Sequence, residues 1–162
     1  MNKKYLLAQT ILLAAGVVYS WSRVVIQFQT FYSKYGTIFR IKDCAYPNPL
    51  VTACFYGAVA FVLAFAWSLK IYLDKELKLI CEKRLRWFLL FGVCFALSVL
   101  AFEFLLYYKV YRPAGPIIAC SPGVFPLKTP CFVGLCIYLA GFIWANYIVK
   151  KSFFDTSSAI NQ

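Results

Sequence analysis

Four long stretches of apolar residues constrain this 162-residue chain more than any other feature of its sequence. They cover about 5–29, 50–73, 87–108 and 131–149, and few charged residues interrupt them. At about 1.5 Å of rise per residue, a helix over each stretch is long enough to cross a hydrocarbon core of ~30 Å. Backbone polar groups in a bilayer must be satisfied within the segment, which favours helices over open sheets. The sequence therefore predicts an all-α fold, an integral membrane four-helix bundle that forms a single domain over 1–162.

The composition agrees with a membrane protein. Hydrophobic residues make up 62% of the chain and charged residues 14%, which is far more apolar than a soluble domain. The basic start MNKK and the first apolar stretch could also form a signal peptide, with Ser20-x-Ser22 as the cleavage site. The apolar stretch continues past Trp21 and Arg23, however, so we expect a helix that is retained.

The basic residues predict the orientation in the membrane. Ten of the 17 lysines and arginines lie at 3–4, 70–86 and 150–151, and the other seven lie toward the opposite side, six in the two remaining connections and Arg23 near the end of the first apolar stretch. The positive-inside rule then places both termini, including a short tail over 152–162, in the cytoplasm. The net charge of +11 suits contact with anionic membrane lipids, and no pattern of a nucleic-acid reader accompanies it.

Two cysteine-bracketed segments repeat each other. They are CAYPNPLVTACFYG at 44–57 and CSPGVFPLKTPCFVG at 120–134, and both end in Thr-x-Cys-Phe-x-Gly. The match predicts a duplicated two-helix unit in parallel orientation, with repeats over about 5–73 and 87–149.

Each repeated segment is expected to lead into a helix. Thr52 and Thr129 are suited to cap the helices that follow them. Gly57 and Gly134 come about one turn further on, where a missing side chain allows close contact between helices.

The seven cysteines divide by position. Four lie in or beside the two connections opposite the termini: Cys44, Cys54, Cys120 and Cys131. Four cysteines allow three pairings, of which the simplest joins Cys44 to Cys54 and Cys120 to Cys131 and staples each outer loop. The other three are expected to stay reduced, with Cys94 and Cys136 as small packing residues inside helices.

Several kinds of chemistry are excluded or disfavoured by the residue types. The chain has no histidine, which excludes haem ligation by histidine and nucleophilic catalysis by Ser-His or Cys-His pairs. It also lacks a Cys-x-x-Cys motif and carries only six carboxylates. We therefore expect no metal site. Thiols and disulfides remain as the candidate chemistry.

Cys54 and Cys131 stand at predicted helix starts, where the positive end of the helix dipole stabilises a thiolate. A disulfide at that position could exchange with thiols of a substrate protein and pass the electrons to a quinone in the membrane. The alternative is a purely structural bridge, which would stabilise a loop of about a dozen residues by roughly 3 kcal/mol. The spacing leaves both open.

Arg23 and Glu103 are charged residues inside predicted spans, at comparable depth near the outer leaflet. Charges in a bilayer are costly and are usually paired or functional. They could pair with each other or reach the interface. They could also bind a quinone, with Arg23 at a carbonyl oxygen and Glu103 handling its proton.

A four-helix bundle with cytoplasmic termini and a cysteine pair in each outer loop resembles the bacterial DsbB-type quinone-linked disulfide oxidoreductases, and more distantly the vitamin K epoxide reductase group. Those families carry a Cys-x-x-Cys pair at a helix start, and the helix starts here offer single cysteines. The resemblance implies a bacterial inner-membrane protein with a quinone cofactor. It implies that Cys54 or Cys131 is the thiol next to the quinone, with Cys44 and Cys120 as exchange partners.

Three functions are therefore predicted as alternatives. The first is a membrane thiol–disulfide oxidoreductase that takes electrons from an outer-compartment substrate protein to a quinone. The second is a non-catalytic accessory subunit of a larger membrane complex. The third is a small transporter or channel subunit with Arg23 and Glu103 in its pathway.

Overall fold

The computed structural model describes residues 3–37, 48–74, 78–110 and 124–160. The long helices in these ranges are α1 (Lys3–Tyr35), α2 (Ala53–Leu73), α3 (Lys78–Tyr107) and α4 (Pro130–Ile160). Two short 3-10 turns, η1 (Pro49–Val51) and η2 (Pro126–Lys128), precede α2 and α4. The predicted all-α fold with four long helices is confirmed.

All four helices are long and apolar enough to cross a membrane. In the most apolar window of each helix, between 17% and 33% of the residues are buried inside the bundle. Most apolar side chains of these windows therefore face outward, where water would make them unfavourable and lipid would not. This is the surface of an integral membrane protein.

Three helices are longer than the apolar stretches that predicted them. α3 begins at Lys78, nine residues before its stretch at 87–108. α1 continues to Tyr35, into residues expected to begin a loop. α4 continues to Ile160 and includes most of the residues expected to form a short tail. Neither glycine nor proline occurs between 142 and 160, so the sequence holds no strong helix breaker there.

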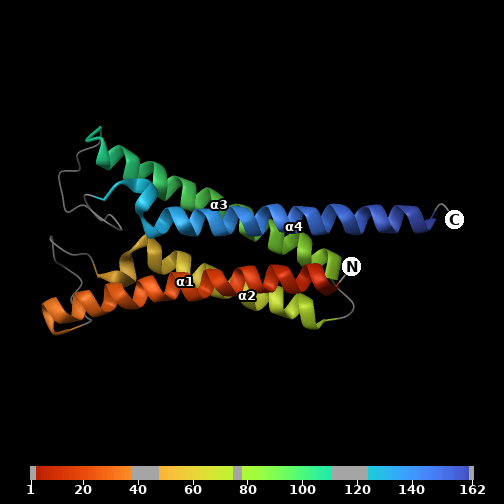
Figure 1. Cartoon of the computed structure of the whole chain (residues 1–162), viewed down its shortest axis with the longest axis horizontal. Helices are drawn as coiled ribbons and strands as arrows, with labels where there is room; N and C mark the ends of the chain where they lie inside the picture. The colour runs from red at the N-terminus through yellow and green to blue at the C-terminus, as the bar shows by residue number, and fades with distance from the viewer. Residues whose placement is uncertain (1–2, 38–47, 75–77, 111–123, 161–162) are drawn as a thin grey trace.

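The helices form two hairpins. α1 packs most extensively along α2 and α3 along α4, and the hairpins meet through α1 with α4 and α2 with α3. Figure 1 shows that the hairpins separate toward the end where α2 and α4 begin. We call this the thiol end, and we call the opposite end, near which the chain begins and α4 finishes, the terminal end.

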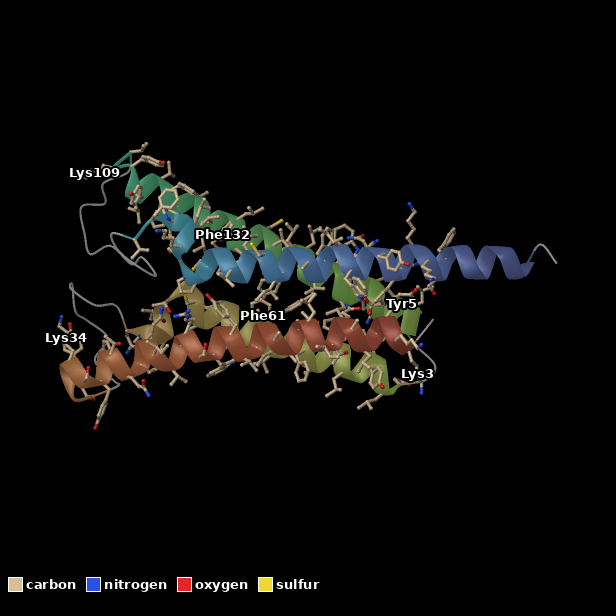
Figure 2. The ribbon with its side chains drawn as sticks, viewed as in Figure 1. Lys3, Tyr5, Lys34, Phe61, Lys109 and Phe132 are labelled. Carbon is tan, nitrogen blue, oxygen red and sulfur yellow. The ribbon has the colours of Figure 1, made fainter. Side chains whose placement is uncertain are left out.

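Two aromatic rings fill the space between the hairpins. Phe61 of α2 and Tyr138 of α4 are buried and stack on each other, with ring centroids 4.0 Å apart. Each ring packs on a glycine of its own hairpin: a Cβ on Gly16 would lie 2.7 Å from Phe61 Cε1, and a Cβ on Gly92 would lie 2.6 Å from Tyr138 Cε1. Figure 2 shows Phe61 in this central position.

The close contacts predicted at Gly57 and Gly134 are not found. A Cβ on Gly57 would meet no atom within 4 Å, and one on Gly134 would have its nearest neighbour, in Phe61, at 4.0 Å. The reason is that both glycines border a hollow between the hairpins rather than a helix crossing. The hydroxyl of Tyr138 donates a hydrogen bond of 3.2 Å to the carbonyl oxygen of Gly57 across this space.

Candidate thiol site at the start of α2 and α4

The start of α2 is shaped by a short capped turn. The side chain of Asn48 accepts a hydrogen bond from Leu50 N at 3.0 Å, and Pro49 opens the 3-10 turn that follows. Thr52 then ends this turn and caps α2, since its side chain accepts from Phe55 N. The predicted cap at Thr52 is confirmed, and it places Cys54 as the second residue of the helix.

The start of α4 uses the same turn with a different role for its threonine. Thr129 Oγ1 lies 2.7 Å from the carbonyl oxygen of Pro126, as Thr52 Oγ1 does from that of Pro49. Thr129 Oγ1 also lies 3.0 Å from Glu103 Oε2, so it ties the start of α4 to the last turns of α3. Within the described residues, its side chain makes no capping bond to the first turn of α4, in contrast to the prediction.

These two turns bring two thiols together. Cys54 and Cys131 are each the second residue of their helix, and their Sγ atoms are 3.5 Å apart. A disulfide bond is about 2.05 Å long, so a small movement of the two side chains would be enough to form one. The two cysteines belong to different hairpins, so such a bond would join the halves of the bundle.

The disulfides predicted within the two outer loops involve two further cysteines. Cys44 and Cys120 lie outside the described residues, so the pairings of Cys44 with Cys54 and of Cys120 with Cys131 stay predictions. Of the three pairings that four cysteines allow, the contact between Cys54 and Cys131 matches the one that pairs Cys54 with Cys131 and Cys44 with Cys120.

A pocket opens beside the two thiols. Its empty space is about 530 Å³ when the part open to the surroundings is included, and all four helices contribute to its wall. The wall is mostly apolar, and Phe61, Phe95 and Tyr138 supply aromatic surface next to the cysteines. The mostly apolar lining is typical of pockets that bind small organic molecules, although the enclosed volume is only about 60 Å³.

Positive charge is concentrated at this pocket. Arg23 is part of its wall, and its guanidinium carbon lies 5.3 Å from the ring centroid of Tyr19. The N-termini of α2 and α4, which carry the positive ends of two helix dipoles, also meet here. No carboxylate lines this pocket among the residues that the structure describes. The site therefore favours an anion or a group that gains electrons.

Arg23 and Glu103 are separated in the structure. Arg23 is exposed beside the pocket, whereas Glu103 is buried and is held by the hydroxyl of Thr129. Only Arg23 is thus placed beside the thiols, and Glu103 lies outside the pocket wall.

Two residues of the site were not singled out from the sequence. Phe61 and Tyr138 have the same sequence separation as Cys54 and Cys131, and Gly16 and Gly92 have nearly the same one. Continuing the comparison of the two repeats beyond the cysteine segments would have matched these aromatic rings.

The remaining cysteines lie apart from the site. Cys81 is partly buried near the terminal end, and Cys94 and Cys136 are exposed on the outside of the bundle. The last two were expected to be packing residues; instead they lie on helix faces that meet the surroundings. Within the described residues, no group of three or more potential metal-binding side chains occurs.

No family model, curated protein or solved structure matches this chain.

Proposed function

We propose that this protein is a membrane thiol oxidoreductase in which Cys54 and Cys131 form the redox pair and a quinone is the electron acceptor. The contact of 3.5 Å between the two sulfur atoms carries this proposal. A dithiol that cycles through a disulfide requires this close approach of two sulfur atoms, and here it occurs beside an apolar pocket that is open to an electron acceptor.

The chemical step is the closure of one bond. Cys54 and Cys131, as two thiols, form an S–S bond and give up two protons and two electrons. A quinone supplies the oxidising chemistry, since it takes up two electrons and two protons to become a quinol. The helix N-termini at both cysteines favour the thiolate that attacks in thiol–disulfide exchange.

The pocket suits this acceptor. Phe61, Phe95 and Tyr138 offer flat apolar surface for a ring, and Arg23 can donate hydrogen bonds to a carbonyl oxygen that gains negative charge. The position beside lipid-facing helices gives a membrane-soluble molecule a direct route to the thiols.

The outer cysteines complete the cycle in this proposal. The substrate protein's thiols reduce a disulfide that involves Cys44 or Cys120, and exchange then returns Cys54 and Cys131 to the thiol state. For this the thiol end must face an oxidising compartment, which corresponds to cytoplasmic termini in a bacterial inner membrane.

A duplicated origin explains how the pair arose. One hairpin contributes Cys54 and the other contributes Cys131, each after a proline-led 3-10 turn closed by a threonine. We infer that the two hairpins are repeats of one unit and that the redox pair lies where equivalent positions of the repeats meet.

The proposal is tested with the full-length protein in proteoliposomes that contain a quinone. We expect Cys54→Ser and Cys131→Ser each to abolish quinone-dependent oxidation of an added dithiol while the protein still accumulates in membranes. Cys94→Ser, which alters an exposed thiol outside the site, should retain the wild-type rate. Full activity of both site variants would refute the proposal. If the two site variants accumulate less in membranes and the wild-type protein itself transfers no electrons to quinone, the accessory-subunit alternative is favoured.

A further inference from the structure

A second polar site lies inside the bundle, near the terminal end. Gln9 of α1 and Glu82 of α3 are both 0% exposed. In the described part of the chain, α1 and α3 do not pack against each other. Each of them packs against α2 and α4 instead. The two side chains therefore extend from opposite corners of the bundle into its centre.

The core around this pair is otherwise mostly apolar. Buried leucine and isoleucine side chains of all four helices form it: Leu6, Leu13, Ile71, Leu85, Leu89 and Ile148. Another polar contact near this end is a hydrogen bond of 2.9 Å between Thr10 Oγ1 and Ser68 Oγ, which links α1 to α2.

The carboxyl of Glu82 and the amide of Gln9 meet each other. Beyond this mutual contact, neither group has a hydrogen-bond partner in the described part of the chain. Arg86 follows Glu82 by one turn, but its guanidinium lies over the ring of Trp87 and 3.5 Å from Asn146 Oδ1. A buried carboxylate without a counter-charge is strongly unfavourable, so this group either holds a proton or meets a positive charge from solution.

We propose that Gln9 and Glu82 bind one small monovalent cation, sodium or potassium. Carboxylate and amide oxygens are suitable ligands for such hard ions, and the single carboxylate matches a single charge. A divalent cation would call for more carboxylates, and the described residues hold no cluster of three acidic, histidine or cysteine side chains.

This site is separate from the thiol pocket. Phe95, the residue of the pocket wall nearest to Glu82 along α3, comes 13 positions after it, which is about 20 Å along the helix. The cation proposal can therefore fail without affecting the proposed redox function, and the reverse also holds.

The test is equilibrium binding of radioactive sodium to the purified full-length protein in detergent. We expect saturable binding of one ion per chain, displaced by unlabelled sodium or potassium. Glu82→Gln should weaken the affinity at least about tenfold, because it removes the only charged ligand. Gln9→Leu should weaken it as well. The control is Glu103→Gln, which changes the other buried acid of α3 and should leave sodium binding unchanged.

A second measurement covers the case in which a variant does not fold. The melting temperature of the wild-type protein should rise with sodium and saturate, when choline keeps the ionic strength constant. Wild-type protein that binds no radioactive sodium and gains no stability from sodium or potassium would overturn the proposal. The Glu82 carboxyl would then carry a proton instead.

Discussion

The packing of Tyr138 on Gly92 makes a sharp prediction about the core. A Cβ on Gly92 would lie 2.6 Å from Cε1 and 2.7 Å from Cδ1 of Tyr138, which is well inside van der Waals contact. The ring has little room to give way, because it is stacked on Phe61 and its hydroxyl is bonded to the carbonyl oxygen of Gly57. Gly92→Ala must therefore displace either the ring or a helix.

The magnitude follows from two opposing effects. Forcing an extra carbon into a packed core costs about 1–3 kcal/mol. Replacing glycine by alanine inside a helix returns roughly 0.5–1 kcal/mol. We expect Gly92→Ala to lower the free energy of unfolding by about 1–2 kcal/mol as the difference of the two effects.

Gly141→Ala is the matched control. A Cβ there would lie 3.7 Å from Leu13 Cδ2 and 3.8 Å from the methyl carbons of Leu89, which are ordinary contacts. This variant keeps the helix-propensity gain without the steric cost, so its stability should equal or exceed that of the wild type.

The assay is unfolding by sodium dodecyl sulfate in mixed micelles, followed by circular dichroism. Combining Gly92→Ala with Tyr138→Leu should recover part of the loss, because the smaller side chain leaves room for the methyl group. Equal stability of Gly92→Ala and Gly141→Ala would refute the packing described for the two hairpins.

Three further predictions concern single contacts. Tyr138→Phe removes the hydrogen bond to Gly57 and should lower the free energy of unfolding by about 0.5–1.5 kcal/mol in the same unfolding assay. Thr129→Val takes a donor from buried Glu103 and should cost about 1–3 kcal/mol, whereas Thr129→Ser should stay near wild type; equal effects of the two would argue against this bond. Arg23→Gln should raise the quinone KM about tenfold, equivalent to ~1.4 kcal/mol, in steady-state kinetics; an unchanged KM would remove Arg23 from the proposed site.

The sequence predicts the helices well because their signal is local. Long apolar stretches mark the helices, and Thr52 marks the start of one of them. Neither signal depends on knowing which helices pack together. The lengths of α1 and α4 were underestimated because hydropathy reports the apolar part of a helix and not its polar ends.

Contacts between helices could not be read from the sequence in the same way. The repeat predicted that Cys54 and Cys131 are equivalent, but equivalence does not say that the two positions face each other. Glu82 lies among Lys83, Arg84 and Arg86, and this local run of charges does not mark it as a buried residue. Its spacing from Leu85 and Leu89 is nevertheless that of a buried helical stripe, and this was the signal for its burial.

The central claim is that Cys54 and Cys131 are a redox pair served by a quinone. Differential alkylation of intact membranes, followed by mass spectrometry of all seven cysteines, measures this directly. We predict that added quinone converts the thiols at Cys54 and Cys131 into a disulfide, while Cys94 and Cys136 keep their labelling. A redox state of Cys54 and Cys131 that does not change with quinone would contradict the account.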